Sequence, residues 1–484
     1  MSIFENTPPG TMVMSSLLWV RISDLGNNYE RAKAALTLQP VDQSLFRPNE
    51  PAPPPTLLYE ERDGWFGMPR AYGYGKLAHR LAIRDVRIDA TGTVPFLFRG
   101  QWRDYQVAPV QGVIAGLKRQ PNGGCLKAGC GAGKTIMALG IMAELKAPTL
   151  VIVHNTGLRS QWEESAQEFL GLRPHEIGRV QQDECDYRGK RLVTAITQSL
   201  TARQYGYPEE FYRWPSFVIY DEVHRAAAPT FSWWMSHFPA KYRLGLSATV
   251  DKRNDGREDV YFWHLGGIIA VSGRDEIKPK VFQYLLPPLC PEYRRRNGEP
   301  IIAKMVSHLA GTASSDESSR AVPAPNPQSI ARSTIMAEEI VKALKVGRKV
   351  IVLSDRIPLL HDLERRVRQG WNGGTVDYYV GGKTVQQLEI AKLSNLILGT
   401  YAMASEGLDI ADLDTLVLAT PKSNVEQSVG RIMRSLPGKK TPFVLDFVDT
   451  VSVFTRMASR RLSWYRSQGY ETASVERRVT RAVI

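Results

Sequence analysis

The stretch GGCLKAGCGAGKTIMALGIMAEL, residues 123–145, decides the fold. A short apolar strand runs into the small-residue segment Ala128–Thr135, and a run of good helix formers follows it. Small residues let the backbone wrap around a triphosphate, and N–H groups at a helix start face an anion. The pattern predicts a phosphate-binding loop in which Lys134 reaches the β- and γ-phosphates and the Thr135 hydroxyl binds Mg²⁺. The alternative is a glycine-rich turn between strand and helix, since Ala128 stands where the strict pattern has glycine.

Apolar runs and amphipathic stretches alternate beyond this loop. Before residue 310 the apolar runs include TLVIV, RLVTAIT, FVIYDE and YRLGLSAT, and after residue 330 they include KVIVLS, LILGT, TLVLAT and FVLDFVD. Repeated strand–helix units are typical of an α/β fold, and strands buried on both faces read as continuous apolar runs. We therefore expect two α/β domains in tandem, each built around a parallel sheet.

The segments around these two domains differ in composition. Residues 1–100 are Pro-rich, with short strands joined by Asp-Gly and Thr-Gly turns, which favours a small β-rich module. Residues 310–329 are rich in Ser, Ala and Pro, which is typical of a flexible surface segment. The expected order is an N-terminal accessory module (1–100), a first α/β domain (101–275), a connecting segment with the Ser/Pro-rich insert (276–330), a second α/β domain (331–455) and a basic C-terminal helix (456–484).

The basic tail leaves two interpretations open. Residues 456–484 contain seven Arg and two Glu, and apolar residues from Val451 to Tyr465 recur at helical spacing. The helix presents either a solvated basic face over an apolar stripe packed on the second domain, or a contact for nucleic acid.

The charge of the whole chain also points to a polyanion. Lys and Arg number 62 against 49 Asp and Glu, so the formal net charge of the 484 residues is +13. Such an excess indicates a polyanionic partner, most often nucleic acid, although a soluble basic enzyme fits as well. The four cysteines contain no CxxC pair, which argues against a zinc site or a disulfide framework. Since no signal region or bilayer-length apolar run is visible, we expect a cytoplasmic protein without a membrane partner, in the host cytoplasm if the chain is viral.

A second motif follows the apolar run Phe217–Tyr220, where the sequence continues DEVH. A carboxylate at a strand end beside a phosphate-binding loop can hold Mg²⁺ through water, which is the role we expect for Asp221. Glu222 can position and deprotonate an attacking water. The pair alone is weak evidence, but together with the upstream loop it indicates ATP hydrolysis. We expect the SAT segment at 247–249 to be either a connection that senses the bound nucleotide or an ordinary turn.

A third motif, EQSVGRIMR, spans residues 426–434 in the second domain. Arg431 and Arg434 are three residues apart, so we expect them on one face of a helix. Their permanently charged guanidinium groups can neutralise the γ-phosphate in the transition state. The alternative is a pair of surface arginines on a helix.

Taken in order, these motifs resemble those of the superfamily 2 DExH helicases and translocases. The motifs occur in the order that is typical of the family, and they cover about residues 101–450. In chain order they are AxxGxGKT, a strand followed by QW, ITQSL, DEVH, SAT, EGLD and QxxGRxxR. The segment DKRNDG at 251–256 resembles the R-x-D-G segment of XPB-like and UvsW-like motors, and the whole is most similar to members encoded by bacteriophages and large DNA viruses. The resemblance implies two RecA-like parallel-sheet domains.

The resemblance also implies roles for individual residues. Gln106, with Arg103 nearby, matches the adenine-reading position, although a surface Gln at a helix start is the alternative. Asp409 of the EGLD element helps to close the nucleotide site. The implied catalytic set is Lys134, Glu222, Gln427, Arg431 and Arg434. The implied nucleotide and metal contacts add Gly129, Gly131, Gly133, Thr135 and Asp221. The implied contacts to the nucleic-acid backbone are Thr156, Arg159, Gln161, Thr197, Gln198 and Thr400.

The function implied is that of a monomeric ATPase, stimulated by nucleic acid and using ATP and Mg²⁺. It would couple hydrolysis to movement on, or remodelling of, DNA in replication, recombination or repair, with branched or forked DNA as a suitable substrate. Residues 1–100 could bind DNA or a replication or transcription protein. Three alternatives stay open: a double-stranded DNA translocase without strand separation, an RNA helicase, and a non-enzymatic nucleic-acid-binding scaffold. Trp233 and Trp234 are interpreted as core residues and Lys383 as a surface lysine.

Overall fold

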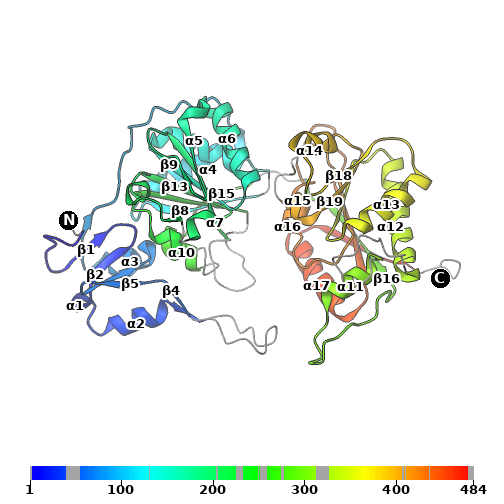
Figure 1. Cartoon of the computed structure of the whole chain (residues 1–484), viewed down its shortest axis with the longest axis horizontal. Coiled ribbons are helices and arrows are strands. Elements are labelled where there is room, and N and C mark those ends of the chain that lie inside the picture. The colour runs from blue at the N-terminus through cyan, green and yellow to red at the C-terminus, as the bar shows by residue number, and fades with distance from the viewer. Residues whose placement is uncertain are drawn as a thin grey trace. The chain divides into compact units, whose positions relative to one another are not determined.

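The computed structural model forms two compact units, Met1–Arg274 and Asp275–Ile484, each of which is described by itself (Figure 1). The residues described are 3–39, 55–129, 131–202, 205–224, 233–248, 250, 259–273, 277–311, 326–405, 408, 410–434 and 436–477.

The first unit begins with a five-stranded sheet in the order β5-β6-β2-β1-β7. Only the β1–β7 pair is parallel, so the β-rich character expected of this region is confirmed. The strands are β1 (Thr11–Met14), β2 (Leu18–Arg21), β5 (Glu60–Arg62), β6 (Trp65–Met68) and β7 (Ala82–Asp85), and β3 (Thr37–Leu38) pairs separately with β4 (Thr56–Leu57). The helices are α1 (Ile22–Leu25), α2 (Asn28–Ala35) and α3 (Arg70–Leu77).

The rest of the first unit is built on an eight-stranded sheet, β11-β10-β12-β9-β13-β14-β8-β15, in which every pair except β10–β11 is parallel. The strands are β8 (Gly123–Ala128), β9 (Thr149–Val153), β10 (Ile177–Gln181), β11 (Glu184–Cys185), β12 (Leu192–Ile196), β13 (Phe217–Asp221), β14 (Tyr242–Ser247) and β15 (Ile268–Ser272). The helices are α4 (Asp104–Leu117), α5 (Lys134–Leu145), α6 (Thr156–Leu170), α7 (Thr197–Thr201), α8 (Glu209–Tyr212) and α10 (Asp259–Leu265), with 3-10 turns η1 (Pro174–Glu176) and η4 (Trp233–Ser236).

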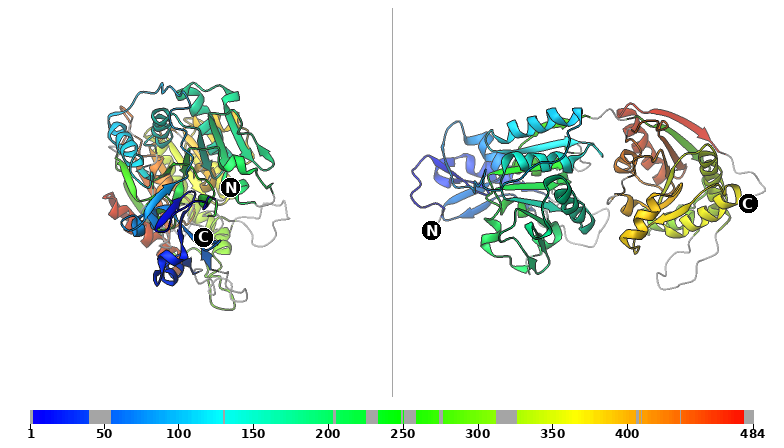
Figure 2. Two further views of the ribbon diagram at one scale, coloured as in Figure 1. Left: turned by 90° about the vertical axis from the view of Figure 1, so that its left-hand side faces the viewer. Right: turned by 90° about the horizontal axis from the view of Figure 1, so that it is seen from above.

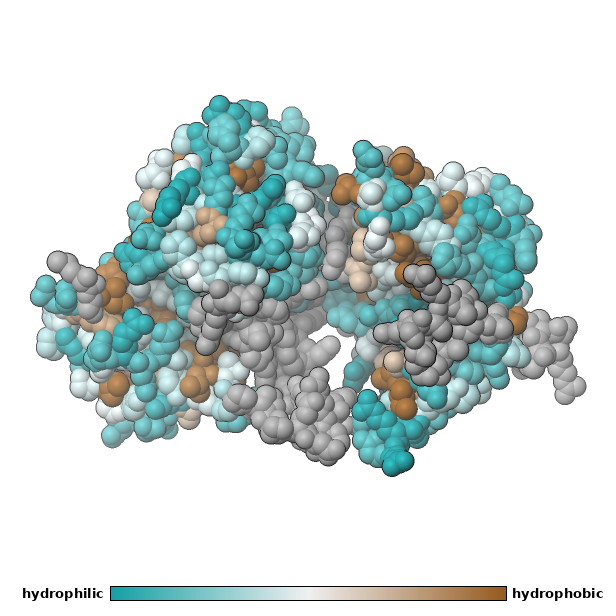
Figure 3. All heavy atoms as spheres, in the orientation of Figure 1, coloured by the Kyte–Doolittle hydropathy of each residue, from teal (hydrophilic) through white to brown (hydrophobic). Residues whose placement is uncertain are grey.

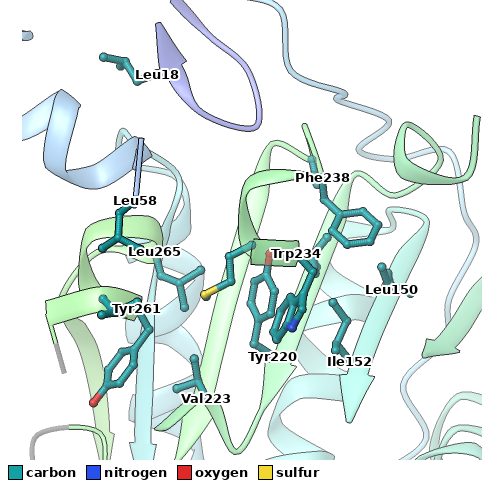
Figure 4. Close-up of a cluster of buried hydrophobic side chains, with 14 of the residues drawn as sticks. Leu18, Leu58, Leu150, Ile152, Tyr220, Val223, Trp234, Phe238, Tyr261 and Leu265 are labelled. Carbon is teal, nitrogen blue, oxygen red and sulfur yellow. The ribbon is translucent and has the colours of Figure 1, made fainter. Parts of the chain in front are cut away.

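One hydrophobic cluster joins the N-terminal sheet to this larger sheet. It contains Met12, Leu18 and Phe66 from the first and Tyr220 from the second. Figure 4 shows part of this cluster, including the ring of Trp234, whose centroid lies 5.0 Å from that of Tyr220. The interpretation of Trp234 as a core residue is therefore confirmed, while the side chain of Trp233 lies outside the described residues.

Two buried arginines cross the same junction. The Arg70 guanidinium donates to the carbonyls of Ala240 (2.9 Å) and Lys241 (3.1 Å), and Arg243 donates to the carbonyl of Ser16 (2.8 Å). Both arginines are at most 1% exposed. Because buried polar groups are costly unless they are hydrogen-bonded, these contacts fix the N-terminal region against the larger sheet.

The second unit contains a seven-stranded, fully parallel sheet in the order β18-β19-β17-β20-β21-β16-β22. Its strands are β16 (Lys280–Leu286), β17 (Val350–Ser354), β18 (Val376–Tyr379), β19 (Leu396–Thr400), β20 (Thr415–Leu418), β21 (Phe443–Asp449) and β22 (Glu471–Glu476). Its helices are α11 (Ile302–Leu309), α12 (Pro327–Lys345), α13 (Ile357–Gly370), α14 (Val385–Lys392), α15 (Tyr401–Ser405), α16 (Glu426–Gly430) and α17 (Ser452–Ser467). The predicted α/β class with two parallel-sheet domains is confirmed.

Two of the expected boundaries differ from the structure. The connecting segment 276–330 contributes β16, which lies between β21 and β22 and so belongs to the second sheet. The helix expected over 456–484 ends at Ser467, and the chain returns as strand β22, drawn in red in Figure 2. The physical reason is pairing: Thr472 and Val475 favour a strand, and β16 offers a free edge to it. Within the described residues, no helix is both long enough and apolar enough to cross a membrane.

Candidate active site and nucleic-acid interface

The predicted phosphate-binding loop joins the end of β8 to the start of α5. Gly131 and Gly133 have φ angles of 76° and 81°, a left-handed conformation that glycine adopts without steric strain. Helix α5 begins at Lys134, so the N–H groups of its first turn face the loop that precedes it. Cys130 of the loop lies outside the described residues. The described part of the loop has the geometry of a site for phosphate oxygens.

Gln106 supports this loop from α4. Its Nε2 donates to the Ala132 carbonyl (2.9 Å), its Oε1 accepts from the Arg103 N–H (3.1 Å), and the residue is 2% exposed. A Cβ atom at Gly133 would lie 2.5 Å from the Gln106 Nε2 atom, so the two segments are in close contact. The alternative of a surface Gln is therefore wrong. Arg103 itself is exposed and donates to the Tyr105 hydroxyl (3.0 Å).

The two carboxylates of the DEVH motif lie beside the loop lysine. The Lys134 Nζ atom is 3.6 Å from Glu222 Oε1 and donates to the Ala128 carbonyl at 3.5 Å. Asp221 accepts from Trp162 Nε1 (2.9 Å) and from the Glu222 N–H (3.0 Å). Parallel pairing of β8 and β13 with β14 places their carboxyl ends, and hence both motifs, at one edge of the sheet.

The electrostatics of this pair suit a cation. The pKa of Asp221 is raised to about 6, chiefly by burial and then by the neighbouring Glu222 carboxylate, while Lys134 and the hydrogen bonds from Trp162 and the Glu222 N–H oppose the rise. Two carboxylates against one lysine leave the site short of positive charge. Carboxylate and hydroxyl oxygens are the donors that Mg²⁺ prefers, so Asp221 and Thr135 fit this metal, with ATP phosphates as its other ligands.

His224 connects this motif to the strand that carries the SAT segment. Its Nδ1 atom lies 2.8 Å from the Ser247 hydroxyl and 3.3 Å from Glu222 Oε2. Ser247 is fully buried at the end of β14, whereas Thr249 lies outside the described residues. Sequence reasoning assigned no role to His224, although its place as the fourth residue of DEVH was the signal that could have found it.

The residues expected to touch nucleic acid in the first unit gather at the carboxyl ends of β9 and β12. An open hollow of about 480 Å³ lies there. Thr156 and Gln198 line the hollow and are exposed, and Gln161 is exposed on α6. The hollow is lined by His154, Asn155, Thr156, Gln181, Gln182, Ile196, Gln198, Ser199, Ala202 and Tyr205. Its amide and imidazole groups are hydrogen-bonding partners for a polar chain. Gln181, Gln182 and Tyr205 belong to no motif and were not predicted from the sequence.

Two other expected contacts are engaged within the first unit. The buried Thr197 hydroxyl donates to the Val153 carbonyl at 2.8 Å and so ties the end of β12 to that of β9. Arg159 donates to Gln181 and lies 3.5 Å from the Glu163 carboxylate. Thr197 is therefore a positioning residue in this structure, and Arg159 would have to exchange partners to reach a phosphate.

In the second unit, Thr400 ends β19 and its Oγ1 accepts from the Met403 N–H (3.4 Å) at the start of α15. On the neighbouring strand β17, the Ser354 hydroxyl donates to the Arg356 carbonyl (2.9 Å). Lys383, which was expected to be a surface lysine, forms an ion pair with Asp377 at 2.6 Å. Glu406, Gly407 and Asp409 of the EGLD element lie outside the described residues.

The expectation that one helix carries both Arg431 and Arg434 is wrong. Helix α16 ends at Gly430, so Arg431 follows the helix directly and Arg434 lies in irregular chain, while Gln427 is half-buried in the helix. The N–H groups of residues 431–433 donate to carbonyls three residues back, which tightens the turn. The side chains of Ile432 and Met433, which follow the helix, are buried.

Comparison with known proteins assigns the family. Residues 99–252 match the model of the type III restriction enzyme res subunit. A protein of Acanthamoeba polyphaga mimivirus, named a putative ATP-dependent RNA helicase, is 30% identical over 90% of this chain and 81% of its own length. A probable helicase of Escherichia phage T5 is 26% identical over 71% of this chain and 72% of its own. A protein of Kineococcus radiotolerans named DNA 3'-5' helicase XPB is 28% identical over 63% of this chain and 53% of its own. The chain therefore belongs to the superfamily 2 helicases and translocases, and it is an ATP-hydrolysing enzyme.

Proposed function

We propose that the chain is an ATP-driven motor that moves on, or remodels, DNA during replication, recombination or repair. The observation that carries the proposal is the approach of Lys134 to Glu222 beside Asp221, which assembles a phosphate-handling cation and two carboxylates at one sheet edge. The net charge of +13 supports a nucleic-acid partner. The name of the XPB relative, a DNA helicase, supports DNA over RNA.

The chemistry proposed for the site follows from its charges. The phosphates of ATP compete with Glu222 for the Lys134 ammonium group, and this exchange leaves the Glu222 carboxylate available to a water. That carboxylate orients the water and takes its proton as the water attacks the γ-phosphate. Mg²⁺ bound by Asp221 and Thr135 would neutralise phosphate charge.

The remaining nucleotide contacts are proposed on the family pattern. Gln106 keeps one N–H and one oxygen lone pair after its two hydrogen bonds, so it can support the loop and read adenine at the same time. Arg103 would assist it. Gln427, Arg431 and Arg434 would stabilise the charge of the transferred phosphate, and Asp409 would help to close the site.

The proposed nucleic-acid contacts are to the backbone and are therefore independent of sequence. Thr156, Gln161 and Gln198 would contribute from the first unit and Thr400 from the second. Arg159 would join them after leaving Glu163. The chain would act as a monomer, and residues 1–100 would offer a surface for replication or transcription proteins.

A second candidate function is that of an RNA helicase. The specific observation in its favour is the name of the mimivirus relative, a putative ATP-dependent RNA helicase. The two functions differ in the polymer that raises the rate of ATP hydrolysis.

The test is ATP hydrolysis at one fixed low salt concentration, first without nucleic acid and then with single-stranded, duplex and branched DNA and with RNA. Stimulation by duplex or branched DNA is expected, and a strand-displacement assay then separates a helicase from a translocase that leaves the strands paired. Stimulation by RNA alone would replace the DNA proposal with the RNA one. Intact DNA binding without hydrolysis under any condition would contradict the motor itself.

A further inference from the structure

A narrow arm projects from the second unit between β16 and α11 (Figure 1). It has the sequence PEYRRRNGEP, residues 291–300, and closes as a hairpin. Arg294 bridges to Pro300, the Ile301 N–H donates to the Tyr293 carbonyl (2.7 Å), and the Arg295 N–H donates to Glu299 (2.7 Å). The side chains of Arg294, Arg295 and Arg296 are all exposed at its tip.

The base of the arm is fixed to α17. The pKa of the Glu292 carboxyl is lowered by hydrogen bonds from Ser452, the first residue of α17, and from Arg294. Arg294 Nε donates to Glu292 at 3.1 Å. Tyr293 packs on a cluster that includes Met305 of α11 and Phe454 of α17. The arm is thus held in a defined position against the two helices.

Helix α17 continues the positive charge of the arm. Its sixteen residues, SVFTRMASRRLSWYRS, include no Asp or Glu. Arg456 and Arg460 are exposed one turn apart, so they lie on the same face. Five exposed hydroxyl side chains accompany them, from Ser452, Thr455, Ser459, Ser463 and Ser467.

Three arginines of the arm and α17 differ from the exposed cations of α13, which pair with carboxylates of their own helix. Among the described residues no ion pair involves Arg296, Arg456 or Arg460. By contrast, Arg365 pairs with Asp362 at 2.5 Å and Arg368 with Glu364 at 3.0 Å on their own helix. Arg294 and Arg295 of the arm pair with Glu292 and Glu299, so the charge that no described carboxylate pairs is that of Arg296 on the arm and of Arg456 and Arg460 on α17. The tip of the arm is strongly hydrophilic on the molecular surface (Figure 3).

The topology places this charge at the edge where nucleic acid is proposed to bind. Because the seven strands are parallel, all of their carboxyl ends lie at one edge of the sheet. The arm follows β16, α17 follows β21, and Thr400 ends β19. Arg356, which follows β17, donates to Ser307 of α11 at 3.3 Å and connects α11 to the same edge.

We propose that the arm and the exposed face of α17, together the basic ridge, bind the phosphate backbone of nucleic acid outside the contacts that the family motifs supply. Guanidinium groups match phosphate geometry with paired donors, and hydroxyl groups add neutral donors, as is common in backbone contacts. The ridge carries no arrangement for reading bases, so it adds affinity without sequence preference. The proposal rests on the function proposed above, because it assumes that nucleic acid is the polymer on which the chain acts.

The test is direct binding of a fluorescent duplex oligonucleotide by the full chain, without ATP, over a series of salt concentrations. The variant carries Arg295→Gln, Arg296→Gln, Arg456→Gln and Arg460→Gln, and leaves Arg294 in place because it supports the arm. The expected result is binding weaker by about tenfold or more, with the slope of log affinity against log salt reduced by about 2 to 4. Basal ATP hydrolysis without nucleic acid stays at the parental rate.

The matched control removes four charges elsewhere on the second unit, by Lys280→Gln, Lys342→Gln, Arg365→Gln and Arg368→Gln. All four side chains are exposed and paired with carboxylates, so their loss lowers the net charge equally. The proposal is overturned if the ridge variant binds duplex with the parental affinity and the parental salt dependence. It is also overturned if the control variant loses as much affinity as the ridge variant. If the parental chain binds duplex through the ridge but nucleic acid does not stimulate its ATP hydrolysis, the proposed motor function is contradicted. The proposal for the ridge is supported in that case.

Discussion

Glu222 combines an uncommon backbone conformation with a cationic neighbour. Its φ of 49° lies in the left-handed region that residues other than glycine rarely adopt. The strain persists because Asp221 accepts the Glu222 N–H and so holds the turn, while Lys134 lies 3.6 Å from the side chain. Strained residues of this kind concentrate at functional sites, which agrees with the proposed role in activating water.

We expect Glu222→Gln to lower ATP hydrolysis by about 100-fold or more, because an amide cannot accept the proton of the attacking water. Binding of nucleic acid, measured by fluorescence anisotropy, stays at the parental level. Glu164→Gln, on the exposed face of α6, is the control and keeps the parental rate. Parental hydrolysis in Glu222→Gln would assign the base to another group.

His264 provides a pH-dependent element of stability in the first unit. It is 3% exposed, and burial, together with Arg243 and Arg70, lowers its pKa to about 3. The unfolded chain binds a proton at this residue near pH 6.5, whereas the folded chain does so only near pH 3. Acid therefore favours the unfolded state, and stability contributed above pH 6.5 is lost as the pH falls toward 3.

We expect His264→Gln to reduce this acid sensitivity. Between pH 7.5 and 5.0 the free energy of unfolding of the parental chain should fall by about 1 to 2 kcal/mol more than that of the variant. Urea unfolding at the two pH values measures the difference. The exposed His79→Gln is the control and should follow the parental chain, and an equal fall in all three proteins would contradict the assignment.

At the scale of elements, strands buried on both faces could be predicted and edge elements could not. The runs TLVIV and VIVLS became β9 and β17, in which every residue is buried. Strand β22 has mostly exposed residues and no apolar run, so only its pairing with β16 defines it. The proximity of Lys134 and Glu222 followed from two local motifs, whereas the contact of His224 with Ser247 depends on the side-chain geometry at adjacent strand ends.

Strand β22 covers one side of β16 and should therefore stabilise the second unit. Truncation after Tyr470 leaves the N–H and C=O groups of β16 open on that side, which costs hydrogen bonds and exposes an edge to aggregation. We expect the thermal midpoint to fall by about 5 °C or more. Truncation after Arg477 retains the strand and is the control. Equal midpoints, with no aggregation on size-exclusion chromatography, would show that the strand is dispensable.

At the scale of the whole molecule, the order of motifs predicted the superfamily because each motif is local in sequence. Contacts between residues far apart in the sequence could not be predicted from such local motifs. Arg70 donates to Ala240, 170 residues away, and neither residue belongs to a motif. The arm at 291–300 was likewise hidden inside a segment expected to be a connection, because a short polar hairpin has no apolar pattern to reveal it.

Arg434 is the arginine on which the family pattern predicts that turnover depends. We expect Arg434→Ala to keep ATP binding, measured with a fluorescent analogue, and to lower hydrolysis by about 100-fold or more, because the transferred phosphate loses a neutralising charge. Arg368→Ala, on the surface of α13, is the control. Unchanged turnover in Arg434→Ala would remove this arginine from the catalytic set.

The hydrophobic cluster shared by the N-terminal sheet and the larger sheet has a consequence for how the protein evolves. Met12, Leu18 and Phe66 pack in one core with Tyr220, so a change of volume on one side must be matched on the other. Recombination that exchanged residues 1–100 between relatives as one segment would break this match, and it would replace both Arg70, the donor to Ala240, and Ser16, the acceptor for Arg243. The N-terminal region should therefore be inherited together with its motor, and its sequence should drift in step with the sheet that it covers.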